Sequence, residues 1–327
     1  MVVQAEVLSF AVLQDIQDSL QIINKQLNGN ASNTSPQVEA VLQQLVTAGG
    51  KRLRPLFTLL AARYFQTDLT PAMPVAMAAE YIHMATLAHD DVIDKSALRR
   101  QRRTINDIWG NQVAILAGDV LLARALVTLV ETGHLDIVKI MAATVQSVCE
   151  GEIAQNVTAY CWDESEEDYF ARIHNKTACF FAACCRVGAL SVGANKLAVD
   201  ALAEYGRLIG LAFQVIDDVL DICGDKGTIG KPTGSDLASG VLTLPVIYAL
   251  KQPELNLMRS TLENGKPAGD IVDTILAVAR TGGGVEYSRT VAETLVQQAK
   301  ACLPVTEQFA IRECLLNIAD MIVQRSF

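Results

Sequence analysis

Residues 83–103 read HMATLAHDDVIDKSALRRQRR, and this stretch decides how the rest of the chain is interpreted. Its apolar start predicts a helix, and residues four apart on a helix share one face, so Asp90 and Asp94 point the same way beside Asp91. Carboxylates this close repel each other, and a hydrophobic helix tolerates them where a cation balances their charge. A single DDxxD motif is also typical of a solvated acidic helix end.

A second stretch repeats the spacing and favours a metal site. Residues 213–221 read FQVIDDVLD, which places Asp217, Asp218 and Asp221 at the end of another apolar run. Carboxylates that face each other suit Mg²⁺, which prefers a few carboxylates, water and phosphate oxygens. The arginines of the first stretch suit phosphate because a planar guanidinium binds it bidentately. Together the patterns predict a diphosphate held through metal.

A basic cluster precedes both acidic motifs. Residues 49–55 read GGKRLRP, with Lys51, Arg52 and Arg54 in one turn. Cations favour a helix carboxyl end, but three this close repel each other unless an anion is near, which favours a phosphate pocket. His83 on its own is more typical of a core histidine.

Composition excludes some classes of protein. Lys plus Arg is 27 and Asp plus Glu is 36, which gives a net charge of −9. This charge argues against a nucleic-acid-binding protein. Nine prolines and 6% aromatic residues favour helices. With no linker-like segment, we expect one all-α domain over residues 1–327. The eight cysteines lack a CxxC pair and predict reduced core thiols in a cytoplasmic protein. No signal peptide or uncharged run of about 20 apolar residues is evident.

Motifs along nearly the whole chain resemble those of trans-type polyprenyl diphosphate synthases, a family that includes hexa-, hepta- and octaprenyl diphosphate synthases. They are GGKRLRP (49–55), IHMATLAHDDVID (82–94), RR (99–100), GDVLLARA (118–125), GEIAQ (151–155), NKTA (175–178), FQVIDDVLD (213–221) and GKPTGSDLASGVLTLP (230–245). Their order and spacing agree with the family. The resemblance implies a helical bundle around a central cavity, Mg²⁺ dependence, and condensation of isopentenyl diphosphate with farnesyl or geranylgeranyl diphosphate.

The resemblance also implies roles for single residues. Metal would be bound by the six aspartates of the two motifs. Isopentenyl diphosphate would be bound by Lys51, Arg54, His83 and Arg100. The allylic diphosphate would be bound by Arg99, Lys176 and Lys231, with Lys226 as an alternative to Lys231. Thr177 and Gln214 would offer oxygens to the developing carbocation, although Thr177 could instead bond to a carbonyl of its own helix.

Five residues depart from the family pattern. Gln101, Arg102 and Arg103 stand where the family has glycine followed by Lys-Pro, and Lys95 replaces a common acidic residue. Val241 replaces a lysine that is frequent after the glycine at 240. The changes at Lys95 and at residues 101–103 put the conformation of the loop after the first motif in doubt, more than the chemistry, whereas Val241 is not expected to be damaging.

Product length is predicted from the residues before the first motif. Short-chain members of the family have a bulky aromatic residue there, whereas this chain has Ala85 and Thr86. The open space favours a product in the hexaprenyl to decaprenyl range, as for a quinone side chain. Tyr81 and Ile82 lie one turn further back and would end the tunnel sooner, and Leu126 on the next helix is another candidate for its floor.

Several alternatives stay open at this stage. A terpene cyclase needs neither GGKRLRP nor a second DDVLD motif, and a non-catalytic subunit usually loses one motif, so both are disfavoured. A geranylgeranyl synthase, and a catalytic subunit that works only with a small partner subunit, both remain. Members of the family pair through long apolar helices, so we expect a homodimer or such a heterodimer.

Overall fold

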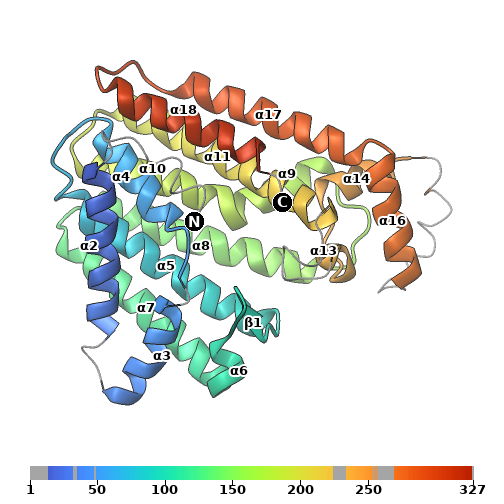
Figure 1. The fold of residues 1–327 in the computed structure, drawn as a ribbon, viewed down its shortest axis with the longest axis horizontal. Helices are drawn as coiled ribbons and strands as arrows, with labels where there is room; N and C mark the ends of the chain where they lie inside the picture. The colour runs from blue at the N-terminus through green and yellow to red at the C-terminus, as the bar shows by residue number, and fades with distance from the viewer. Residues whose placement is uncertain are drawn as a thin grey trace. The chain divides into compact units, whose positions relative to one another are not determined.

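The computed structural model describes residues 14–31, 35–47, 49–223, 233–252, 255 and 269–325. Helices dominate these residues, and their only sheet is one hairpin of two short strands, which confirms the all-α prediction (Figure 1). The elements up to residue 157 are α2 (Gln14–Ala31), α3 (Pro36–Thr47), α4 (Leu53–Arg63), α5 (Ala72–Ile93), β1 (Leu98–Arg99), β2 (Arg102–Arg103), α6 (Ile105–Trp109), α7 (Asn111–Glu131) and α8 (Leu135–Val157).

The remaining elements are again helices. They are α9 (Glu166–Ile173), the π-helix η2 (His174–Ala178), α10 (Cys179–Ser191), α11 (Lys196–Cys223), α13 (Ser235–Ala238), α14 (Leu244–Leu250), α16 (Gly269–Thr281), α17 (Gly284–Cys302) and α18 (Phe309–Val323).

Contacts divide the chain into two compact units. The first unit comprises Met1–Val145, Ala183–Ala203 and Pro304–Leu315, and it contains the first acidic motif. The second unit comprises Gln146–Ala182, Glu204–Leu303 and Leu316–Phe327, and it contains the second acidic motif.

Small residues bring two long helices of the first unit together. In Figure 1, α5 and α7 run side by side. Ala85 and Ala88 on α5 are buried, as are Ala117 and Gly118 on α7. A Cβ on Gly118 would lie 2.2 Å from Nε2 of His89, so glycine leaves room for the imidazole as it is placed here. The close packing holds the first acidic motif on a rigid helix.

α7 has an unusually apolar sequence. Among the described helices it alone is long and apolar enough to cross a membrane, with a mean hydropathy of 2.1 over 18 residues. The helix also carries Asp119 and Arg124. Core helices of soluble proteins pass the same test, so length and composition alone are weak evidence for a membrane segment.

The cysteines are all free, but not all of them belong to the core. Cys184, Cys185 and Cys314 are buried, as predicted. Cys149 and Cys161 are exposed, so the prediction of core thiols is wrong for these two. Both lie in or just after the second half of α8, where the apolar periodicity is weak.

The hairpin that follows the first motif adopts a strained turn. β1 and β2 pair antiparallel, with Leu98 opposite Arg103. The two residues between the strands, Arg100 and Gln101, have φ of 51° and 64°. A two-residue turn with both φ values positive suits strand twist but favours Asn and Gly. The chain therefore keeps the backbone that glycine would favour at Gln101, without the glycine that the family pattern has there.

We predict that Gln101→Gly stabilises the first unit. Glycine adopts positive φ without a Cβ clash, and we expect a gain of about 1 kcal/mol in the free energy of unfolding. Thermal unfolding of the wild-type chain and of Gln101→Gly measures this gain. Gln112→Gly, in the first turn of α7, is the matched control and should destabilise by a similar amount because the helix disfavours glycine there. An unchanged or lower melting temperature for Gln101→Gly would contradict the prediction.

Candidate active site

The first acidic motif splits into two kinds of carboxylate. Asp90 is half-buried near the end of α5 and Asp94 is exposed as its C-cap. Asp91 is buried, and its Oδ1 accepts a hydrogen bond from Nε of Arg99 at 2.8 Å. Because Asp91 points away from the shared face of Asp90 and Asp94, the motif presents an i, i+4 pair and keeps its middle aspartate inside.

Arginines of the hairpin bind the carboxyl end of α3. Arg102 Nη1 donates to the Thr47 carbonyl at 2.6 Å, and Arg100 Nη1 donates to the Gly49 carbonyl. A Cβ on Gly50 would lie 2.7 Å from Arg100 Nη1, so glycine leaves room for the guanidinium. The last carbonyls of a helix lack partners within the helix and attract cations. The hairpin arginines thus join the loop after the first motif to the start of the GGKRLRP segment.

Arg54 and His83 meet in the same unit. The Nη1 atom of Arg54 lies 3.2 Å from Nε2 of His83. Burial, and then the charges of Arg54, Arg100, Arg99 and Arg52, hold the pKa of His83 well below its usual value. A neutral imidazole can accept from Arg54 through Nε2, and the proton then resides on Nδ1. His83 therefore adds no further positive charge to the basic cluster.

The second acidic motif also keeps its middle aspartate inside. Asp218 is 3% exposed and accepts hydrogen bonds from the Tyr169 hydroxyl at 2.7 Å and from Gln214 Nε2 at 2.9 Å. Burial, followed by the charge of Asp236, raises the pKa of Asp218 to about 7. The two hydrogen bonds oppose that shift. Asp218 is thus the buried carboxylate of this motif, and two side chains of the second unit hold it.

The outer aspartates of the second motif are half-buried. Asp217 Oδ1 accepts from Nη1 of Arg325 at 2.6 Å, and that guanidinium lies 4.7 Å from the ring centroid of Phe213. Asp221 Oδ1 accepts from the Ser235 hydroxyl at 3.0 Å. The structure thus brings Arg325, from the C-terminal end of the described residues, to the second motif.

A hydrogen-bonded chain connects the two predicted catalytic oxygens. Thr177 Oγ1 donates to Gln214 Oε1 at 2.9 Å, and Gln214 in turn donates to Asp218. Thr177 therefore bonds to a side chain, and not to a carbonyl of its own helix. It lies in the π-helix η2, a form of helix that is frequent at functional sites. Beside it, Lys176 Nζ lies 2.8 Å from Glu152 Oε2.

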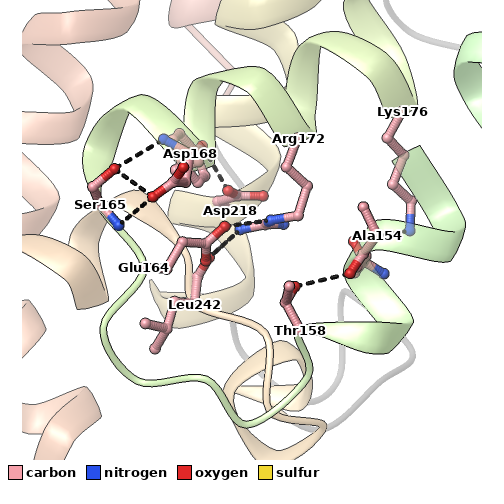
Figure 2. A network of polar contacts seen from close by, with 11 residues as sticks. Ala154, Thr158, Glu164, Ser165, Asp168, Arg172, Lys176, Asp218 and Leu242 are labelled. Carbon is pink, nitrogen blue, oxygen red and sulfur yellow. Dashed lines mark hydrogen bonds and ion pairs between the residues drawn. The ribbon is translucent and has the colours of Figure 1, made fainter. Parts of the chain in front are cut away.

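A small polar cavity adjoins this chain in the second unit. Its volume is about 120 Å³, and Lys176, Gln214, Asp218 and Asp236 line it. Figure 2 shows Arg172 beside Asp218, where its Nε donates to Glu164 at 2.8 Å and its Nη2 donates to the Leu242 carbonyl. The start of α9 is fixed by Ser165 and Asp168, which cap it reciprocally (Figure 2). Arg172 is thereby held at the edge of the cavity.

The residues predicted to set product length are not all brought together. Ala85, Tyr81 and Ile82 are buried on α5, and Thr86 is half-buried. The Tyr81 hydroxyl accepts from Asn30 Nδ2 on α2 at 2.9 Å. Leu126 is 49% exposed on α7, so it is not part of this buried group.

Two predicted site residues lie outside the described part of the chain, and several residues near the site were not predicted from the sequence. Lys231 and its alternative Lys226 lie outside the described residues. Sequence reasoning missed Tyr169, Arg172 and Asp236, whose positions depend on long-range packing. Glu80 could have been found, because a lone carboxylate inside the apolar run AMPVAMAAEYIHM requires a buried partner.

The donors of the two motifs fit a hard cation in their chemistry. All six side chains are carboxylates, the ligands that Mg²⁺ takes together with water and phosphate. Within the described residues of each unit, no three His, Cys, Asp or Glu side chains are grouped closely enough to hold a metal alone.

Comparison with known proteins supplies the family. A family model described as polyprenyl synthetase matches residues 35–278. The chain is 38% identical over 318 residues to heptaprenyl diphosphate synthase component 2 of Geobacillus stearothermophilus, which covers 97% of this chain and 99% of that protein. It is 34% identical to octaprenyl diphosphate synthase of Escherichia coli, over 96% and 94% of the two chains.

A solved structure agrees with the sequence matches. The polyprenyl synthase from Caulobacter crescentus, complexed with calcium and isoprenyl diphosphate, superimposes with a TM-score of 0.89 at 33% identity, over 96% of this chain and 97% of that one. The resemblance and the helical isoprenoid-synthase fold that it implied are confirmed. This chain therefore belongs to the polyprenyl synthetase family and is a trans-prenyltransferase.

Proposed function

We propose that the chain is one polyprenyl synthase domain that condenses isopentenyl diphosphate with farnesyl or geranylgeranyl diphosphate in a Mg²⁺-dependent reaction. The observation that carries this proposal is common to both motifs. Each turns its middle aspartate inward onto partners and leaves an i, i+4 pair, Asp90 with Asp94 and Asp217 with Asp221. These two pairs would hold metal, which, when bound, supplies positive charge that stabilises the departing diphosphate.

The basic groups divide between the two substrates. Lys51, Arg54, Arg100 and neutral His83 would bind isopentenyl diphosphate. Arg99, Lys176 and Lys231 would bind the allylic diphosphate. Arg99 uses Nε for Asp91, and a guanidinium has five N–H donors, so others remain for phosphate.

The reaction balances without another reactant. The carbon–oxygen bond to the allylic diphosphate breaks, the double bond of isopentenyl diphosphate attacks the allylic carbon, and a proton leaves to form the new trans double bond. The departing diphosphate can accept that proton. Thr177 and Gln214 would face the developing positive charge with their oxygens, and a closed site would keep water from quenching it.

A product assay tests the activity, and Asp94→Asn tests the metal assignment. Purified chain, Mg²⁺, labelled isopentenyl diphosphate and either primer should give a ladder of elongated products. Asp94 is exposed, so Asn should leave the fold intact but lower turnover on the order of 100-fold, through loss of a metal ligand. Asp136→Asn, an 85% exposed side chain on α8, is the control and should change nothing. Full activity of Asp94→Asn would overturn the metal assignment, and no incorporation by the folded wild-type chain would overturn the proposed activity.

We propose a product in the hexaprenyl to decaprenyl range, destined for a quinone side chain. This follows from Ala85, which is buried and adds little volume next to the first motif. The runner-up is a geranylgeranyl product, with Tyr81 as an earlier floor.

Ala85→Phe should shorten the product. A phenyl ring near the first motif would fill space that the growing chain needs, so the ladder should end several isoprene units earlier. Chromatographic sizing of the products measures this. Ala85→Ser, nearly equal in volume, is the control and should keep the wild-type distribution. An unchanged ladder for a folded Ala85→Phe protein would show that Ala85 does not line the tunnel.

An apolar stripe on α7 supports pairing with another chain. Its members recur at alternating spacings of four and three residues, the repeat of coiled-coil seams. They are Leu116, Val120, Ala123, Val127 and Val130, of which Leu116, Val127 and Val130 are 63%, 58% and 63% exposed. We propose a homodimer through this stripe. The relative named component 2 makes a small partner subunit the alternative.

A cytoplasmic location remains a prediction.

The double variant Leu116→Asp/Val127→Asp should be monomeric. Light scattering on the wild-type chain should give twice its 35.3 kDa, and the variant should give 35.3 kDa, because buried like charges oppose pairing. Leu197→Asp, an 84% exposed position on α11, is the control and should remain dimeric. A wild-type mass of one chain would contradict the homodimer, and activity only after addition of a second protein would favour the heterodimer.

A further inference from the structure

Arg52 differs from its neighbours in the basic GGKRLRP segment. It is the N-cap residue of α4, has a left-handed backbone with φ of 47°, and is 8% exposed. Lys51 and Arg54 on either side are half-buried. Arginine is almost never fully buried unless it is paired, and a non-glycine residue keeps positive φ only where its surroundings impose it.

The surroundings of Arg52 come from three other helices. Its Nη1 lies 2.5 Å from Oε1 of Glu80 on α5, which is itself 2% exposed. Its Nε donates to Asn24 Oδ1 on α2 at 2.9 Å. Its Nη2 donates to the carbonyl of Val46 near the end of α3 at 3.2 Å. One guanidinium thus connects the basic segment to α2, α3 and α5.

α5 holds the basic segment at two adjacent points. Glu80 binds Arg52, and His83, three residues further along and on the neighbouring turn, contacts Arg54 at 3.2 Å. Glu80 therefore supplies a buried anion for Arg52, the middle cation of the segment.

We infer that Arg52 is a positioning residue, which with Glu80 fixes the basic segment so that Lys51 and Arg54 are presented to isopentenyl diphosphate. The inference rests on the proposed function, which gives those two side chains their substrate. Arg52 itself does not touch the substrate in this arrangement. Its effect is on where its neighbours lie.

The buried pair dictates the choice of variants. Removing one partner leaves an uncompensated buried charge and destabilises the fold, whereas replacing both by apolar residues of similar size is often tolerated. The test therefore uses the full chain with the double variant Arg52→Met/Glu80→Leu. Glu80→Gln is added because it removes the charge of Glu80 but keeps an oxygen that accepts from the guanidinium. Arg52→Lys keeps the charge but loses the planar fork.

Steady-state kinetics with each substrate varied separately give the readout. We expect the double variant to remain folded, with a KM for isopentenyl diphosphate raised roughly tenfold and a KM for farnesyl diphosphate within about twofold of wild type. Glu80→Gln should also raise the KM for isopentenyl diphosphate. Arg52→Lys should raise this KM less than the double variant does. If Arg52 bound the diphosphate directly, Glu80→Gln would release it to the substrate and that KM would fall or stay constant, which would overturn the inference.

A matched ion pair on the same helix separates positioning from stability. Arg63, in the last turn of α4, pairs with Asp15 at 2.5 Å and is 12% exposed. Arg63→Met should lower the melting temperature and leave both KM values unchanged. Equal increases of both KM values in the double variant, or none, would overturn the positioning role. A wild-type chain that incorporates no isopentenyl diphosphate would instead overturn the proposed function.

Discussion

Buried ionisable side chains that are bound by partners from other chain segments organise each of the two units. Asp91 is bound by Arg99 of the hairpin, Asp218 by Tyr169 of α9, and Arg52 by Glu80 of α5. A charge removed from water is tolerated only with a good partner, so each pair fixes two chain segments together. The neighbours of each buried charge then have a defined direction. In both motifs, the inward middle aspartate leaves the i, i+4 carboxylates on a separate face.

The parts of the site that follow helix periodicity could be predicted from the sequence. The shared face of Asp90 and Asp94 needs only a helix of regular pitch, and the apolar runs before both motifs indicate that helix. The order of the motifs along the chain agrees with the family, and this agreement supported the predicted roles. The resemblance also named Lys176, Thr177 and Gln214 as site residues. In the structure Lys176 and Gln214 line one cavity, and Thr177 donates a hydrogen bond to Gln214.

The partners of these residues could not be predicted, because they come from distant segments. Tyr169 and Asp218 are 49 residues apart, and Arg325 and Asp217 are 108 apart. No local pattern specifies such contacts, and their geometry depends on how helices pack. The hairpin at 98–103 was missed for another reason. Its turn residues, Arg100 and Gln101, lack the Asn or Gly that normally indicates a two-residue turn.

Strained backbone conformations lie in the same parts of the chain as the buried pairs of the first unit. Within the described residues, five non-glycine residues have positive φ, and four of them, Arg52, Lys95, Arg100 and Gln101, flank the first motif or the basic segment. Such conformations cost about 1–3 kcal/mol each and persist where surrounding contacts impose them. For Arg52 and Arg100 those contacts are the bonds to Glu80 and to the Gly49 carbonyl. The strain thus lies where the three cations of the basic segment and the three carboxylates of the first motif must be held close together before any substrate binds. The packing of α5 against α7 supplies the rigid support that this arrangement requires.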